Sequence, residues 1–295
     1  MALTDSSIDR ALADLDSASA AQIRQALAAP GFSGQITDCG PTAAAQLLPL
    51  AAQLLPLAAS FSVHPISGFA VGAVAVGASG HLYLGANLEF QGMPLHATLH
   101  AEQSAVLNAW MHNEHELTAL YVSETPCGHC RQFLRELSNL DTLQIHVGTQ
   151  IHTLQSLLPH AFGEPRSKGH GLLDSPSIPL EAVKPQPNTS QQRAINAAQR
   201  SYAPYSRSPE GFVLECLDGQ FFSGRAAESA AFNPSVPSVL VALNQRNLSN
   251  SRKVAIATAT EAKLATAINN PLPFASTLIS SVSKAEIKVV QMDAR

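Results

Sequence analysis

The chain has 295 residues, 45% of them hydrophobic, which is enough for two average domains with a sizeable core. Its formal net charge is −4 with only 18 Lys and Arg, which argues against a nucleic-acid-binding protein, since such proteins usually carry a basic face. The sequence shows no secretory signal and no apolar run of transmembrane length, so we expect a cytoplasmic protein that does not bind membranes. In that compartment thiols stay reduced, and paired cysteines indicate a metal or redox site rather than a disulfide.

The N-terminal segment is predicted to be helical. Apolar residues recur at helical spacing through residues 1–30, and a Pro30-Gly31 turn follows. The heptapeptide AAQLLPL then occurs at 44–50 and again at 51–57. Two copies are too few for a coiled coil, and each contains a proline, which opposes a helix interior. We therefore predict a Leu-rich buried segment that arose by local tandem duplication.

From Gly68 onward the sequence alternates between strand and helix patterns. Strands are predicted at 68–76, 81–90, 119–124 and 143–148, and helices at 99–116 and 126–139. The resulting order β-β-α-β-α-β fits a layered α/β sandwich.

The C-terminal part repeats this order after a segment dense in proline, serine and glycine. Its predicted elements are a helix at 191–203, a hairpin at 211–225 with an Asp218-Gly219 turn, a helix at 238–247 and a strand at 253–259. The two hairpins can be aligned, with gaps, so that Gly85 lies over Gly224 and Glu89 over Glu228. This weak similarity predicts an internal duplication.

Two short motifs carry the chemistry, His100-Ala101-Glu102 and Pro126-Cys127-Gly128-His129-Cys130. A catalytic zinc needs three protein ligands and an open position for water, and His100, Cys127 and Cys130 supply three. The cysteines are i and i+3, so they share the face of a helix whose N-terminal dipole favours thiolates. Glu102 is not needed to hold the metal, but a base is needed to take the proton of the water. His100 and Glu102 reach one metal only if His100 lies at the helix entrance, before regular geometry begins.

Other interpretations of the motifs are a thioredoxin-like redox pair, a structural zinc with His129 as fourth ligand, and a non-catalytic scaffold. The combination of both motifs with Glu102 favours a catalytic zinc, one Zn²⁺ per chain. Cys39 and Cys216 are expected to be ordinary small buried residues. The remaining histidines are expected to be surface or core residues, including His96, His112, His115 and His146.

The H-x-E … P-C-x-x-C arrangement is the known signature of zinc-dependent nucleobase deaminases, and it is recognised here rather than worked out from geometry. The sequence resembles the cytidine deaminase family, and within it the two-domain homodimeric bacterial type. The resemblance is strongest over 67–73, 85–90, 100–105 and 125–133, continues through 157–163, and is weaker over 202–211 and 228–237. It implies a layered α/β/α sandwich around a mixed sheet, duplicated as an active and a degenerate domain.

Residue roles follow from the resemblance, position by position. It implies that His100, Cys127 and Cys130 hold the zinc and that Glu102 shuttles protons. It also implies substrate contacts: Asn87 and Glu89 on the ribose 3′-hydroxyl, Phe69 on the pyrimidine, the Ala101 N–H and Thr125 C=O on the base edge, and Phe162 from the neighbouring subunit. Ala70 departs from the family, which often has asparagine there.

The predicted function is hydrolysis of free cytidine and deoxycytidine to uridine and deoxyuridine with release of ammonia, as in pyrimidine salvage. Glu102 is expected to take the proton of the metal-activated water, pass it to N3 and protonate the leaving amine. Deamination of a related amino-heterocycle, a nucleotide or nucleic-acid cytosine stays open, although the sequence shows no clear basic channel or phosphate site.

The chain is predicted to divide into four segments. These are an N-terminal helical segment (1–45), the catalytic domain (46–162), a linker (163–190) and a degenerate, non-catalytic domain (191–295). Where the histidine motif should recur, the chain reads NPSVPS at 233–238, and no second C-x-x-C follows. We therefore expect the second domain to bind no metal and to have a structural role in a homodimer.

Overall fold

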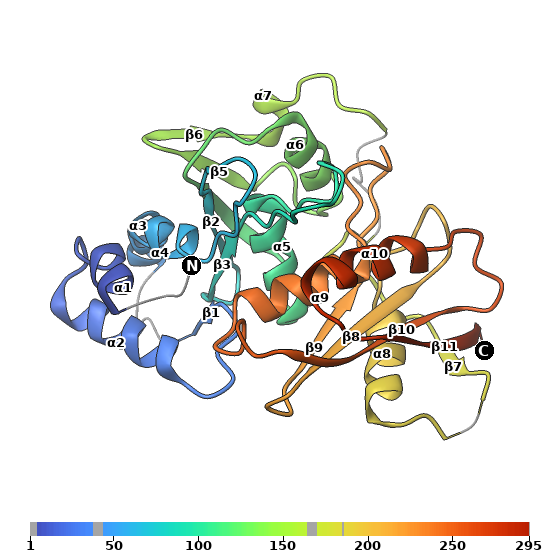
Figure 1. Cartoon of the computed structure of the whole chain (residues 1–295). Coiled ribbons are helices and arrows are strands. Elements are labelled where there is room, and N and C mark those ends of the chain that lie inside the picture. The colour runs from blue at the N-terminus through green and yellow to red at the C-terminus, as the bar shows by residue number, and fades with distance from the viewer. Residues whose placement is uncertain (1–4, 38–43, 164–169, 185, 295) are drawn as a thin grey trace. The chain divides into compact units, whose positions relative to one another are not determined.

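The computed structural model describes residues 5–37, 44–163, 170–184 and 186–294, so Cys39 lies outside the described residues. The chain divides into two compact units (Figure 1). The first unit comprises Met1–Glu89, Thr98–Asp174 and Leu248–Asn250, and the second comprises Phe90–Ala97, Ser175–Asn247 and Ser251–Arg295. Among the described residues, no helix has the length and apolar character needed to cross a membrane.

The first unit is built around a six-stranded sheet of order β1-β3-β2-β4-β5-β6. The strands are β1 (Gln35–Ile36), β2 (Gly72–Gly77), β3 (Leu82–Ala86), β4 (Leu117–Val122), β5 (Gln144–Val147) and β6 (Gln150–His152). Strands β4 and β5 pair in parallel and the other neighbours are antiparallel, so the sheet is mixed, as predicted.

Helices cover both faces of this sheet. They are α1 (Asp5–Ala11), α2 (Ser17–Ala28), α3 (Ala44–Gln53), α4 (Leu55–Ala59), α5 (Ala101–Met111), α6 (Gly128–Leu134) and α7 (Leu154–Leu157). A side chain at Gly72 would collide with the backbone of α4, and one at Gly85 with the backbone of α5. Ala73 is paired with Gly85, so Gly72 and Gly85 point to opposite faces. The predicted α/β/α sandwich is confirmed.

The Leu-rich repeat forms α3 and α4, and the prediction that proline keeps the repeat out of a helix interior is wrong for Pro49, which lies inside α3. A proline inside a helix costs about 3 kcal/mol. Leu47, Leu54 and Leu57 are buried in the core of the unit, and each buried leucine contributes about 1.5–3 kcal/mol. The burial of these side chains therefore outweighs the missing hydrogen bond of the exposed Pro49.

The second unit has a five-stranded sheet of order β7-β11-β10-β8-β9. Its strands are β7 (Leu180–Ala182), β8 (Glu210–Cys216), β9 (Phe221–Arg225), β10 (Ile256–Leu264) and β11 (Ile287–Ala294), and its helices are α8 (Thr189–Gln199), α9 (Ser238–Asn247) and α10 (Leu272–Val282). Strands β10 and β11 are parallel and the other pairs are antiparallel, which repeats the mixed arrangement of the first unit.

Glycines mark the duplication. Gly211 lies against α8 as Gly72 lies against α4, and Gly224 lies against α9 as Gly85 lies against α5. Gly72 and Gly85 are separated by the same number of residues as Gly211 and Gly224. The two hairpins therefore match without the gaps that the sequence alignment needed. The correspondence starts at Gly72, inside β2, because the preceding residues 68–71 are not part of the strand.

Candidate active site

The histidine motif lies at the start of α5. His100 is the N-cap residue, with extended backbone angles of φ −84° and ψ 156°, and Glu102 follows in the first turn. The Gln103 side chain accepts a hydrogen bond from the His100 N–H at 3.4 Å, which closes this helix start. His100 therefore lies at the helix entrance, where its ring and the Glu102 carboxyl can reach the same point.

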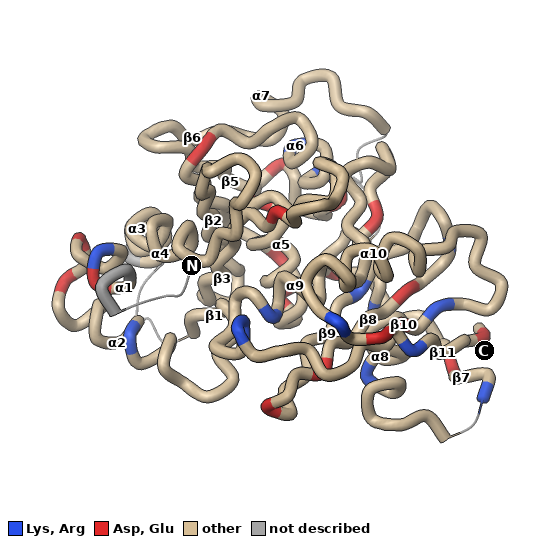
Figure 2. Tube along the Cα trace, in the orientation of Figure 1, with Lys and Arg blue, Asp and Glu red and all other residues tan. Residues whose placement is uncertain are grey.

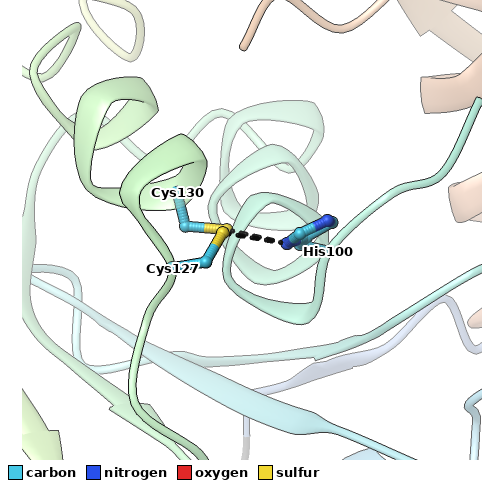
Figure 3. A group of neighbouring side chains, drawn as sticks. All are labelled: His100, Cys127 and Cys130. Atoms are coloured by element: carbon cyan, nitrogen blue, oxygen red, sulfur yellow. Dashed lines mark hydrogen bonds between the residues drawn. The ribbon is translucent and has the colours of Figure 1, made fainter. Parts of the chain in front are cut away.

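The cysteine motif lies at the start of α6. Cys127 is the N-cap residue, also extended, and Cys130 lies in the first turn. The sulfur atoms are 3.7 Å apart, and the His100 Nδ1 is 3.4 Å from the Cys127 Sγ and 3.3 Å from the Cys130 Sγ. Figure 3 shows the three side chains pointing toward one another from two separate helices.

This donor set fits zinc. A tetrahedral zinc with Zn–S of about 2.3 Å and Zn–N of about 2.0–2.1 Å separates two sulfurs by about 3.8 Å and each sulfur from the nitrogen by about 3.6 Å. The observed separations agree within a few tenths of an ångström. His100, Cys127 and Cys130 are the metal-binding group found among the described residues, and His129 is not part of it. The group offers three donors, so it leaves a position for water, as a catalytic rather than a structural site requires.

The electrostatics of the group favour an ionised thiol. The hydrogen bond between the Cys127 and Cys130 sulfurs, together with the nearby His100, lowers the pKa of Cys127 to about 3. The neighbouring Cys127 in turn raises the pKa of Cys130, as does burial. A hydrogen bond to Cys127 raises the pKa of His100.

Glu102 is buried, and burial raises the pKa of its carboxyl group. A carboxyl with a raised pKa is suited to holding and releasing a proton. The side chain lies on the wall of a pocket of about 310 Å³, together with His100 and Cys127.

The same pocket collects most of the substrate contacts that the sequence predicted. Its lining residues are Ser67, Phe69, Val71, Asn87, Glu89, Thr98, Leu99, His100, Ala101, Glu102, Glu124, Thr125 and Cys127. Cys130 is fully buried behind the wall, where it contacts the other two members of the metal-binding group.

Phe162 does not line the pocket of its own chain. Its backbone is held by the Gln132 side chain, which donates to the Phe162 carbonyl at 3.0 Å and accepts from its N–H at 3.1 Å. The phenyl ring is 65% exposed.

The segment before β2 is shaped by Asn87 and Glu89. The Glu89 carboxylate accepts hydrogen bonds from the Ile66 N–H at 2.8 Å, the Ser67 N–H at 3.0 Å and the Ser67 hydroxyl. Burial raises the pKa of this carboxyl group, but the hydrogen bonds from Ser67 and Ile66 outweigh burial, so the net result is a lowered pKa. Ser67 was not among the predicted site residues, although it lies in the stretch 67–73 that carries the resemblance.

A second contact missed from the sequence is a ring stack at the metal-binding group. The imidazoles of His100 and His129 lie nearly parallel, with centroids 5.4 Å apart and planes at 18°. The sequence placed His129 beside both cysteines but gave no information about the direction of its ring. Of the other residues considered, Cys216 and His146 are buried, as expected, and His146 stacks on Tyr121.

Comparison with known proteins gives matches to one family. The family model "Cytidine and deoxycytidylate deaminase zinc-binding region" matches residues 49–146, and a second model of the same description matches residues 154–270. Curated relatives of the chain are named cytidine deaminase. That of Pectobacterium carotovorum subsp. carotovorum (strain PC1) is 47% identical over 68% of this chain and 66% of the relative. That of Proteus mirabilis (strain HI4320) is 45% identical over 72% of this chain and 70% of the relative. The chain spans about two thirds of the length of the curated relatives it matches.

Solved structures are similar over a smaller share of the chain. The cytidine deaminase from Mycobacterium tuberculosis is 32% identical and covers 42% of this chain and 100% of its own, with a TM-score of 0.36. That from Burkholderia pseudomallei is 27% identical and covers 41% and 100%, with a TM-score of 0.35. The sequence matches to curated relatives and to family models on both halves show that this chain belongs to the cytidine deaminase family.

Proposed function

We propose that the protein catalyses the zinc-dependent hydrolytic deamination of free cytidine and deoxycytidine, forming uridine or deoxyuridine and ammonia. The observation that carries this proposal is the shared pocket: His100, Cys127 and Glu102 lie on its wall together with Asn87 and Glu89. The pocket therefore has donors for a metal and a base at one place and polar groups for a sugar at another.

His100, Cys127 and Cys130 would hold the ion. Bound zinc supplies a Lewis acid that makes a water molecule acidic enough to act as a nucleophile near neutral pH. The Glu102 carboxylate would take one proton of that water while the water oxygen forms a bond to C4 of the cytosine ring, and would deliver this proton to N3. It would then move the second proton, from the new C4 hydroxyl, to the 4-amino group; the C4–N bond breaks, ammonia leaves and the C4 carbonyl of the uracil ring forms. One residue can serve all these steps because its buried carboxyl favours proton uptake.

The base would be oriented by backbone groups and one aromatic ring. Ala101 is the first residue of α5, so its N–H has no partner within the helix and is available to the pyrimidine edge. The Thr125 carbonyl is proposed as the acceptor, and both residues line the pocket. The Phe69 ring is 53% exposed on the same wall and offers a flat surface for the pyrimidine.

Charge favours an unphosphorylated substrate. No Lys or Arg occurs between Arg24 and Arg131, a stretch that includes every residue lining the pocket. Figure 2 shows β2, β3 and α5 free of basic positions. The lining instead contains Glu89, Glu102 and Glu124, which would repel a phosphate group. This distribution favours a nucleoside over a nucleotide or a nucleic acid.

We also propose a cytoplasmic homodimer in which Phe162 completes the pocket of the partner subunit. The exposed Phe162 ring and its position outside the pocket of its own chain support this arrangement. The second unit is proposed to be catalytically silent.

The experiment is ultraviolet monitoring of cytidine conversion to uridine with zinc quantified in the same sample. Ammonia release from cytidine, deoxycytidine, cytidine monophosphate and other amino-heterocycles is then compared. The proposal predicts that the two nucleosides are the best substrates and that activity scales with zinc content. A better rate with the nucleotide or with an unrelated heterocycle would refute it.

A further inference from the structure

The second unit contains a cavity of about 500 Å³. Its lining residues are Tyr205, Ser206, Ser208, Glu210, Ala226, Ala227, Glu228, Phe232, Ser235, Val236, Pro237, Ile268, Asn269, Asn270 and Pro271. The cavity lies beside the N-terminal end of α9, just as the first unit's pocket lies beside the N-terminal end of α5. It is therefore the duplicated counterpart of the pocket in the first unit.

One polar contact of the first pocket is reproduced with its geometry. The Glu228 carboxylate accepts from the Tyr205 N–H at 2.9 Å, the Ser206 N–H at 3.1 Å and the Ser206 hydroxyl. Glu89 accepts from the three corresponding groups of its own unit, at 2.8 Å and 3.0 Å for the two backbone bonds. The carboxylate proposed to contact sugar is thus held in the same way in both units.

The groups that carry chemistry have been replaced. Ser238 lies against Gly224 as Ala101 lies against Gly85, so Pro237 takes the place of His100 and Val239 that of Glu102. Proline and valine neither bind a metal nor move a proton. A ligand in this cavity would therefore be bound and not converted.

The lining indicates what kind of ligand fits. The Phe232 ring is 72% exposed at the cavity and offers a flat apolar surface, as Phe69 does in the first unit. The buried Glu210 carboxyl accepts from the Ser238 N–H at 2.8 Å and hydroxyl at 2.6 Å. Among the lining residues there is no Lys or Arg, and the nearby Lys263 ammonium donates to the Asn270 side chain at 2.9 Å. Two carboxyl groups and no lining cation disfavour a phosphate.

We propose that the second unit binds a free nucleoside in this cavity without converting it, with Glu228 on the sugar hydroxyls and the Phe232 ring against the base. The assignment of Glu228 rests on the proposed function, because it takes Glu89 as a sugar contact. The assignment of Phe232 does not depend on it.

The test is equilibrium binding of uridine, which the deamination reaction does not consume, to the zinc-loaded full chain. The expected stoichiometry is two uridine molecules per chain. Phe232→Ala is expected to weaken one of the two sites by ~10-fold or more, because base stacking on an aromatic ring is lost. Since Phe232 is exposed, this change leaves the core intact. The matched change Phe69→Ala is expected to weaken the other site only.

A gain-of-affinity variant provides a second test. Ala226 occupies the place of Asn87, since the Ala226 N–H donates to the Glu210 carbonyl at 3.2 Å as the Asn87 N–H donates to the Val71 carbonyl at 3.4 Å. Ala226→Asn restores an amide beside Glu228 and is expected to tighten the Phe232-dependent site by ~5-fold. Uridine monophosphate is expected to bind this site more weakly than uridine.

The outcomes separate this inference from the proposed function. If the protein converts cytidine but binds only one uridine per chain, and Phe232→Ala does not change that binding, the inference is overturned and the proposed function stands. A second equivalent that is insensitive to both Phe232→Ala and Ala226→Asn also overturns it. Failure to convert cytidine refutes the proposed function, while a Phe232-dependent uridine site in the same sample still supports the inference.

Discussion

Asn87 holds the backbone of Phe69, because its Nδ2 donates to the Phe69 carbonyl at 3.0 Å. Its Oδ1 accepts from the Val71 N–H at 2.9 Å and from the Ser62 hydroxyl at 2.5 Å. The amide expected from the sequence to contact ribose therefore also fixes the wall against which the base is proposed to pack. A change at Asn87 acts on both ends of the nucleoside.

Asn87→Ala is expected to raise the KM for cytidine by ~10-fold or more, because both the sugar contact and the support of Phe69 are lost. Asn87→Asp keeps the acceptor for Val71 but loses the donor to Phe69, and its effect should be intermediate. Zinc content should stay at the wild-type level in both variants. Steady-state kinetics with metal analysis checks this; unchanged KM values would remove the case for Asn87 as a substrate contact.

Glu102→Gln is expected to reduce kcat by ~10²–10⁴-fold, since a positioned general acid–base group contributes about that much. The variant should keep its zinc and its fold, because glutamine has nearly the same size and Glu102 is not a metal ligand. Turnover, zinc content and circular dichroism are measured on the same preparation. Near-normal turnover would show that another group moves the proton.

Cys127→Ala and Cys130→Ala are each expected to release zinc and to abolish activity together, because two donors are too few for tight binding. Cys216→Ala is the matched control: this free, buried cysteine lies on β8 in the second unit and is not part of the metal-binding group. The control should keep both zinc and activity. Full zinc retention in Cys127→Ala would point to different ligands.

Glu261→Val is expected to stabilise the protein, and more so at higher pH. Glu261 is 1% exposed and both of its carboxyl oxygens are buried without a hydrogen-bond partner in the described part of the chain. Burial, followed by the nearby Glu210, raises its pKa to about 7, while Lys263 acts in the opposite direction. Between the unfolded pKa of about 4.3 and the folded value, the folded state binds more protons, so stability falls as pH rises through this window.

The Glu261→Val variant loses this dependence of stability on pH. Its free energy of unfolding should exceed that of the wild type by about 1–3 kcal/mol at pH 8 and by less at pH 5, as measured by denaturant titration. Glu261→Gln, which is neutral at every pH, is the control for charge. If the difference between wild type and Glu261→Val did not change with pH, Glu261 would not be the titrating group.

One zinc per chain and a homodimer are expected for the active protein. Phe162→Ala should lower activity without changing zinc content, because its ring is proposed to act on the partner's pocket. Metal analysis on a protein of known mass tests the first expectation, and sedimentation at the assay concentration tests the second. Two zinc ions per chain, or a fully active monomer, would contradict these expectations.

Local patterns were sufficient to predict the helix starts at the site. His100 and Cys127 lie at the N-caps, because a helical pattern begins directly at each motif. The start of β2 was less accurate, at Gly72 rather than Gly68. The Asn87 side chain, distant in sequence, bonds the Phe69 carbonyl and the Val71 N–H and holds the intervening residues as a loop. Helix α10 and strand β11 lay in a part of the chain for which no element had been predicted.

The ring stack of His129 on His100 could not be predicted either, since it depends on how two helices meet rather than on spacing. The dimer and the individual substrate contacts stay predictions, because each depends on a bound molecule or a second chain. The domain boundaries also stay predictions.

The two helix starts at the metal-binding group differ in how they are closed. At the start of α5, the Gln103 side chain accepts a hydrogen bond from the His100 backbone N–H. The N-cap residue of α6, Cys127, makes no side-chain capping bond. Metal binding by Cys127 and Cys130 would therefore stabilise the first turn of α6. Because His100 binds the same ion, this turn and the start of α5 would unfold as one cooperative unit. In hydrogen exchange, the amides at the start of α6 would lose protection on chelation well before those of α5.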